Sequence, residues 1–200
     1  IAPGRSLGAT PSQIVVVELE DKGLLTNSPV GHVVEILGTI DEPGMETEIA
    51  VRKFDLPYKF SEETKKEIKR FSDSVTKSDL RDRVDLRDIP FVTIDGADAK
   101  DFDDAVYCLP LEDGKFRLLV AIADVSHYVK PGCAIDKDAQ LRTTSVYFPR
   151  RVIPMLPEEL SNGLCSLNPQ VDRCTMVCDA IIGANGLVEA YQFYPAVIRS

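Results

Sequence analysis

The feature that most constrains this chain is a cluster of five aspartates within ten residues. The cluster spans positions 95–104 and contains a single basic residue, Lys100. Apolar runs typical of strands flank it at residues 89–94 and 105–109. Two carboxylates held close together repel each other by roughly 4 kcal/mol at an effective dielectric of 20. We therefore predict that two strands hold a loop whose carboxylates face one site, where bound cations offset the repulsion.

The carboxylates of this loop predict a site for hard divalent cations. Ligand sets made only of oxygen suit Mg²⁺ or Mn²⁺, and Mg²⁺ commonly takes a few carboxylates together with phosphate oxygens of a substrate. The candidate ligands are Asp95, Asp101, Asp103 and Asp104. Asp98 is interpreted as an ordinary loop residue.

Two other interpretations of the acidic segment fit it less well. An EF-hand would place Asp101, Asp103 and Glu112 at loop positions one, three and twelve. Its sharp turn needs a glycine where this chain has Val106. A plain acidic surface loop is the structural alternative, and the apolar runs on both sides argue against a loose tip.

The charge balance of the whole chain is acidic. Lys and Arg number 23 against 32 Asp and Glu, so the formal net charge is −9. A field of that sign repels nucleic acid unless a local basic patch or a bound cation reverses it. No apolar run approaches the roughly 18 residues of a membrane helix, so we expect no membrane partner.

The cysteines are typical of a reduced, cytoplasmic protein. Their number is odd and no CxxC pair is present, so the sequence indicates neither a closed disulfide framework nor a zinc site. We interpret them as small buried side chains in strands, at Cys108, Cys133, Cys165, Cys174 and Cys178.

The order of apolar runs and turns predicts an α+β chain in three segments. Residues 1–59 show strand patterns at 13–19, 30–37 and 46–52, which are too few to close a barrel and so predict a partial one. Residues 60–84 form a charged linker, in which Ser61 and the glutamates after it predict a helix over 61–74.

Residues 85–200 predict an α+β domain with a mixed sheet. Its strand patterns lie at residues 89–94, 105–109, 116–123, 175–182 and 187–194. A short helix is predicted near residues 135–141, within a long irregular stretch. The chain begins without Met or a signal-peptide pattern and stops straight after a strand pattern, so we expect an internal part of a longer polypeptide.

Several motifs of this last segment resemble the catalytic domain of the ribonuclease II family, also called the RNB domain. They include Asp85-Leu86-Arg87-Asp88, the segment from Thr93 to Ala105, and residues 120–126. The resemblance continues through residues 145–149, 153–157 and 160–169. Residues 13–59 are similar, more loosely, to the later strands of that family's second cold-shock-like domain, an oligonucleotide-binding (OB) barrel.

The resemblance implies an activity and its residues. The family hydrolyses single-stranded RNA from the 3′ end and releases nucleoside 5′-monophosphates with Mg²⁺, for which Mn²⁺ is expected to substitute. It implies catalytic and metal-binding roles for Asp95, Asp101, Asp103 and Asp104. We expect Asp95 and Asp104 to be direct ligands, Asp103 to position a second cation or the water, and Asp101 to support either.

A small aromatic and basic run predicts contact with RNA. Tyr147 and Phe148 precede Arg150 and Arg151, and single-stranded RNA is commonly held by stacking on aromatic rings together with backbone cations. By resemblance Tyr147 is the base-stacking tyrosine of the family. The structural alternative is that both aromatic residues belong to the core and the arginines are solvated.

The resemblance also implies partners. Besides single-stranded RNA, these are other parts of the same polypeptide, namely upstream cold-shock strands, the downstream catalytic half and an S1 domain. Basic RNA-binding parts outside this chain would reconcile its acidity with an RNA substrate. Two alternatives from other classes are a non-catalytic RNA-binding or partner-docking module and a carboxylate–metal phosphatase that acts on small substrates.

Overall fold

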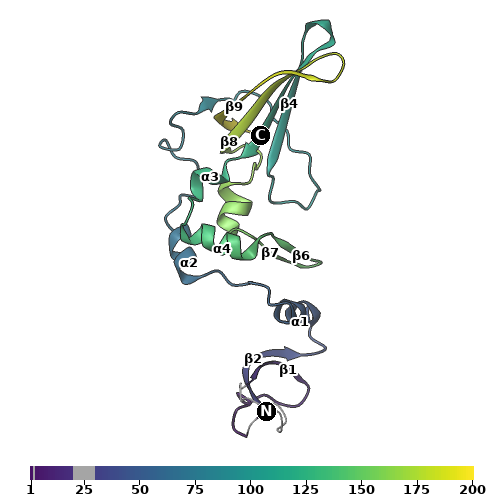
Figure 1. The fold of residues 1–200 in the computed structure, drawn as a ribbon, viewed down its shortest axis with the longest axis vertical. Helices are drawn as coiled ribbons and strands as arrows, with labels where there is room; N and C mark the ends of the chain where they lie inside the picture. The colour runs from purple at the N-terminus through teal and green to yellow at the C-terminus, as the bar shows by residue number, and fades with distance from the viewer. Residues whose placement is uncertain (2, 20–29) are drawn as a thin grey trace. The chain divides into compact units, whose positions relative to one another are not determined.

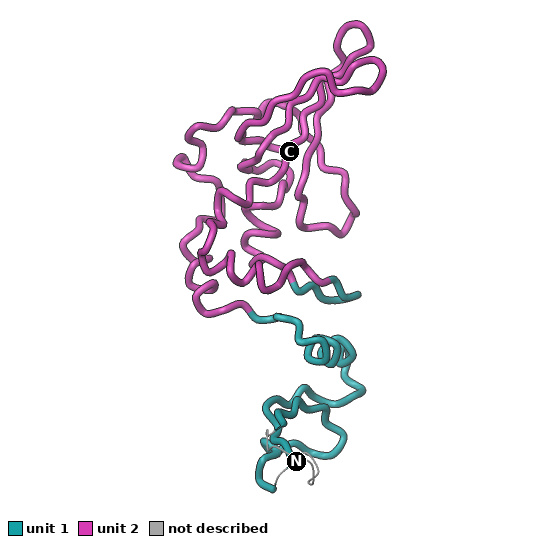
Figure 2. Tube along the Cα trace, viewed as in Figure 1, with its two compact units in different colours: residues 1–59, 147–153 teal, residues 60–146, 154–200 magenta. Residues whose placement is uncertain are grey.

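The computed structural model describes residues 1, 3–19 and 30–200 and divides the chain into two compact units (Figure 2). The first unit comprises residues 1–59 and 147–153, and the second comprises residues 60–146 and 154–200. Within the described ranges, no helix is long and apolar enough to cross a membrane.

An antiparallel strand pair begins the first unit. Strand β1 (Gln13–Leu19) pairs with β2 (Gly31–Thr39) along its whole length, with two register irregularities. Both strands lie where the sequence predicted them, and the turn expected between them falls outside the described residues. The part of this unit that is described closes no barrel, as predicted for a partial one.

Helix α1 (Met45–Lys53) occupies the segment for which we predicted a third strand, so that prediction was wrong. Acidic residues in its first turn and basic residues in its last turn complement the helix dipole. Arg52 pairs with Glu48 one turn earlier and also donates two hydrogen bonds, of 2.7 and 3.2 Å, to Glu35 of β2. Glu46, Glu48 and Arg52 lie at spacings of two and four residues, which fit either period, and the Arg52–Glu48 ion pair favours the helix.

The second unit is built on a mixed five-stranded sheet (Figure 1). Its strand order is β3-β9-β8-β5-β4, in which β3 pairs with β9 in parallel and all other pairs are antiparallel. The strands are β3 (Val84–Asp85), β4 (Asp104–Pro110), β5 (Phe116–Ala123), β8 (Asp172–Ile182) and β9 (Val188–Arg199). The prediction of an α+β chain with a partial barrel followed by a mixed sheet is confirmed.

The strand predicted at residues 89–94 does not form. Only Val92 pairs with a strand, through reciprocal backbone hydrogen bonds of 3.0 and 2.9 Å with Val106. Pro90 has no N–H to donate to a ladder, and the chain is irregular from Thr93 to Asp103. The edge of the sheet opposite β4 is formed by the two-residue strand β3.

Short helices contribute to the core of the second unit. They are α2 (Glu62–Ile68), α3 (Val125–Tyr128), α4 (Ala134–Arg142) and a π-helix (Glu159–Leu164), with a 3-10 turn at Glu112–Gly114. The Ser61 hydroxyl accepts a hydrogen bond from the Thr64 N–H at 3.2 Å, as its predicted capping role requires. Helix α2 ends six residues before the predicted position 74, whereas α4 agrees with the prediction.

One buried cluster joins the sheet to these helices. It includes Leu119, Ala121, Val177, Ala196 and Ile198 from the strands, and Tyr128, Ile135, Leu160 and Leu164 from the helices. Strand alternation places Ile122, Met176 and Phe193 on the opposite face, where they are 47%, 41% and 64% exposed.

The cysteines are all free, but only two of them are buried. Cys165 and Cys174 lie in the interior, whereas Cys108 is exposed on β4. The remaining two are half-buried, and Cys133 precedes α4 rather than lying in a strand. The prediction of buried strand residues was therefore wrong for some of them.

Candidate active site

The predicted site aspartates lie in the irregular loop between the Val92–Val106 bridge and the start of β4. Asp95 follows the bridge, and Asp104 is the first residue of β4. Between them the Ala99 N–H donates to the Gly96 carbonyl at 3.0 Å, which turns the chain. The loop therefore returns the chain to the sheet, where Asp104 begins β4.

A buried serine fixes the returning arm of this loop. The Ser166 hydroxyl donates to the Lys100 carbonyl at 2.7 Å and accepts from the Phe102 N–H at 3.0 Å. The Leu167 N–H adds a bond to the Phe102 carbonyl at 2.9 Å. These contacts hold the backbone on both sides of Asp101, so Ser166 positions the carboxylates although it carries no charge.

A buried arginine supports that serine. Arg173 on β8 donates from Nε to the Ser166 carbonyl at 2.7 Å, and both residues are buried. Burial lowers the pKa of the Arg173 guanidinium. Sequence reasoning missed both residues, and the only available signal was that Ser166 falls within the motif at 160–169.

The last two aspartates point to opposite sides of the chain. The Asp103 carbonyl accepts from the Ala123 N–H at 2.9 Å, which extends the ladder in which Asp104 pairs with Ile122. Neighbouring residues in a strand alternate between faces, so Asp103 lies on the core side and Asp104 on the side of Ile122. The effect of Asp103 on the buried Cys165 agrees with a position on the core side. Burial raises the pKa of the Cys165 thiol to about 12, and the negative charge of Asp103 also raises it.

Asp103 is the electrostatic centre of the group. Desolvation raises the pKa of its carboxyl, and the negative charges of Asp101, Asp104 and Asp95 raise it further. The negative charges of the other three predicted aspartates therefore reach Asp103.

Their donor chemistry fits a hard divalent cation, because all the ligand atoms are carboxylate oxygens. In the described ranges, however, no three His, Cys, Asp or Glu side chains are already arranged around one ion. The opposite directions of Asp103 and Asp104 give a physical reason for that open arrangement.

A buried ion pair fixes the end of β5 beside this loop. Arg83 donates to Asp124 at 2.5 Å, and their side chains are only 6% and 9% exposed. Arg83 also donates to the carbonyl of Thr175 at 3.1 Å and to that of Ala196 at 3.4 Å, which ties β8 and β9 to the same point. Sequence reasoning assigned no role to this pair.

The predicted RNA-contacting tyrosine lies in a different unit from the aspartates. Tyr147 is 65% exposed in β6 (Val146–Phe148), which pairs with β7 (Arg151–Ile153). The core alternative for Tyr147 is therefore wrong. Arg151 forms an ion pair with Glu48 of α1, within the same unit, so it is not simply solvated.

Comparisons with known proteins agree with this architecture. Residues 83–200 match the family model described as RNB domain, and residues 1–61 match the one described as Cold shock domain. The chain is 52% identical over 193 residues to Ribonuclease R of Vibrio parahaemolyticus, covering 96% of this chain and 23% of that protein. It is 49% identical over 200 residues to Ribonuclease R of Escherichia coli K12, covering 100% and 25%.

Solved structures show the same fold. Mycoplasma genitalium RNase R in complex with double-stranded RNA superposes with a TM-score of 0.91 at 32% identity, covering 100% of this chain and 35% of that one. Yeast Ssd1, described as a pseudonuclease, reaches a TM-score of 0.70 at 17% identity, covering 94% and 24%, and shows the fold alone. The chain thus spans about a quarter of the length of the two bacterial relatives compared above.

Proposed function

Because this chain belongs to the RNB family, we propose that it supplies the carboxylate part of the active site of an exoribonuclease. The complete enzyme would hydrolyse single-stranded RNA from the 3′ end and release nucleoside 5′-monophosphates. The observation that carries this proposal is the loop between the Val92–Val106 bridge and β4, which carries all four aspartates and is held by the Ser166 hydroxyl.

The four aspartates would have different roles according to their positions. Asp95 and Asp104 would bind Mg²⁺ or Mn²⁺ directly, Asp103 would position a second cation or the attacking water, and Asp101 would support either. A bound divalent cation supplies charge neutralisation of the phosphate and a lowered pKa of the attacking water. Ser166 and Arg173 would contribute by holding the loop, so that little reorganisation is needed when RNA binds.

Tyr147 would bind the substrate rather than take part in hydrolysis. Its exposed ring offers a stacking surface that any base can use. Cytoplasmic location is part of the proposal, since the five free cysteines suit a reducing compartment.

The experiment that tests this function is a gel assay of 5′-labelled single-stranded RNA with the full-length polypeptide in Mg²⁺ or Mn²⁺. We expect a ladder that shortens from the 3′ end, absent for Asp103→Asn and retained for Asp98→Asn, a matched change in the same loop. RNA binding without cleavage would favour the non-catalytic alternative. Cleavage of phosphomonoesters alone would favour the phosphatase.

A further inference from the structure

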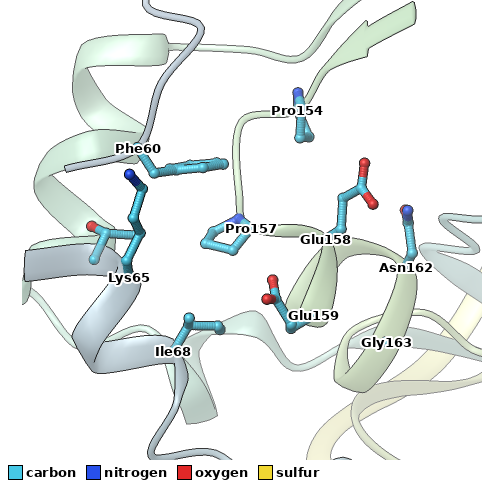
Figure 3. A pocket seen from close by; sticks show the side chains of 10 residues that line it. Phe60, Lys65, Ile68, Pro154, Pro157, Glu158, Glu159, Asn162 and Gly163 are labelled. Carbon is cyan, nitrogen blue, oxygen red and sulfur yellow. The ribbon is translucent and has the colours of Figure 1, made fainter. Parts of the chain in front are cut away.

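A pocket of about 650 Å³ lies in the second unit, apart from the aspartate loop (Figure 3). Phe60, Lys65 and Ile68 form one side, from α2 and the segment that enters it. Glu158, Glu159 and Asn162 form the other, on the π-helix and the residue that precedes it, and Pro154 and Pro157 complete the wall. Pockets of this volume commonly bind a ligand or a side chain of another segment.

Hydrogen bonds join helix α2 to α4, so this pocket is present before any occupant binds. The Glu67 carboxylate accepts from the N–H groups of Ala134 and Ile135, at 2.8 and 3.2 Å, and thereby caps α4. In return the Asp138 carboxylate of α4 accepts from the Ser61 N–H at 2.8 Å. These reciprocal caps fix the wall that carries Lys65 and Ile68.

The aromatic part of the wall is also fixed. The Arg142 guanidinium lies 3.6 Å from the centroid of the Phe60 ring and donates to the Pro154 carbonyl at 2.9 Å. Arg142 is buried and has Asp138 as a nearby counter-charge. Its Nη2 has no hydrogen-bond partner within the described residues, and the guanidinium links both sides of the pocket through Phe60 and Pro154.

The rim of the pocket carries unmatched negative charge. Glu158 and Glu159 are both exposed, and within the described part of the chain neither carboxylate has a hydrogen-bond or ion-pair partner. Lys65, the cation among the lining residues, is held by Glu62 at 2.6 Å. Two carboxylates thus face an apolar floor with no cation of their own.

We propose that this pocket receives an arginine side chain from a part of the same polypeptide outside these 200 residues. A guanidinium is planar, stacks on aromatic rings and binds carboxylates through two parallel hydrogen bonds, while its stem packs on apolar surface. Phe60, Pro157 and Ile68 match the stem and the flat face, and Glu158 and Glu159 match the charge. A nucleotide is disfavoured, because its phosphates would meet the same two carboxylates.

The relatives contain further sequence, and the proposed arginine would come from such a part of the polypeptide. The two Ribonuclease R sequences compared above extend far beyond the matched region. This chain covers 23% and 25% of their full lengths. Docking of a segment of the same polypeptide would also cost little translational entropy. The inference does not depend on nuclease activity, since it concerns a pocket away from the aspartate loop.

Hydrogen–deuterium exchange of peptides covering residues 154–164 tests this proposal. The samples are the full-length polypeptide and the 200-residue chain, each also as a Glu158→Gln, Glu159→Gln double variant. We expect slower exchange in the full-length protein than in the chain. The double variant should raise the full-length rate about tenfold, which corresponds to about 1.4 kcal/mol, and leave the chain unchanged.

Glu63→Gln is the matched control, because Glu63 is an exposed carboxylate on α2 that does not line the pocket. It should leave exchange unchanged in both lengths. Equal exchange of residues 154–164 in the full-length protein and the chain would overturn the proposal. So would protection that develops only after single-stranded RNA is added, which would make the occupant a nucleic acid.

Discussion

Ser166 and Phe102 are 64 positions apart in the sequence, yet the Ser166 side chain holds the aspartate loop by a hydrogen bond from the Phe102 backbone. The Ser166 Oγ accepts from the Phe102 N–H at 3.0 Å while donating to the carbonyl of Lys100. The carboxylates are thus held by a neutral contact from a distant motif. Their own mutual repulsion would open the same loop.

Replacement of this serine should therefore weaken the loop and the fold together. Ser166→Ala removes a fully buried hydroxyl and leaves the half-buried Phe102 N–H without its partner, and we expect a loss of about 1–3 kcal/mol in the free energy of unfolding. Urea denaturation of the chain measures it. Ser161→Ala is the control, because the Ser161 hydroxyl makes only longer bonds, of 3.4 and 3.5 Å. Equal losses in the two variants would contradict the role of Ser166.

The Arg83–Asp124 pair predicts a pH dependence of stability. Burial alone would raise the pKa of Asp124, but hydrogen bonds from Arg83 and Ser126 and the charge of Arg83 outweigh it and hold the pKa below its usual value. A lowered carboxyl pKa stabilises the folded state above the unfolded pKa of about 3.9, and this stability is lost as pH falls through the folded value.

Asp124→Asn should remove that part of the pH dependence. We expect it to cost about 3–5 kcal/mol at pH 7, since it leaves Arg83 buried without its partner. The cost should shrink below about pH 4. Unfolding free energies measured between pH 3 and pH 7 test this. A cost that does not change with pH would contradict the assigned role of the pair.

Thiol reactivity should follow burial. The pKa of Cys165 is raised to about 12 by burial, whereas Cys108 is exposed on β4. Because the thiolate is the reactive form, a thiol reagent at pH 8 should modify Cys108 first and Cys165 only after unfolding. Peptide mass spectrometry over a time course measures both rates. Similar rates at the two cysteines in the folded chain would contradict the packing around Cys165.

Tyr147 should contribute to RNA affinity without affecting hydrolysis of bound substrate. Tyr147→Ala removes an exposed ring, and we expect binding of single-stranded RNA by the full-length protein to weaken by about 1–3 kcal/mol. Tyr191→Ala is the matched control, since Tyr191 is 68% exposed on β9. A fluorescence anisotropy titration compares them. Equal affinities for the two variants would leave Tyr147 without a role in binding.

The carboxylate loop could be predicted from the sequence because the residues that define it are contiguous. The apolar run that became β4 and the aspartates before it are contiguous, so strand alternation and the turn were readable from the chain. The error at α1 arose because Glu48 and Arg52 fit either period, and the bond to Glu35 that helps to select the helix is a tertiary contact.

The contacts that hold the site could not be predicted in the same way. Ser166 reaches the loop from a distant segment, and Arg173 supports Ser166. The partners of both side chains are backbone groups, which no side-chain motif reveals. Likewise, Val92 forms a single bridge where a strand was expected, because Pro90 removes a donor from the same short run.

The claim that Asp95, Asp101, Asp103 and Asp104 act as one metal site is tested most directly by a calorimetric titration of the full-length protein with Mn²⁺. Asp103→Asn and Asp98→Asn are titrated in parallel. We predict binding that is weaker by about tenfold or more for Asp103→Asn and unchanged for Asp98→Asn. Equal Mn²⁺ affinities for the parent protein and Asp103→Asn would contradict the site.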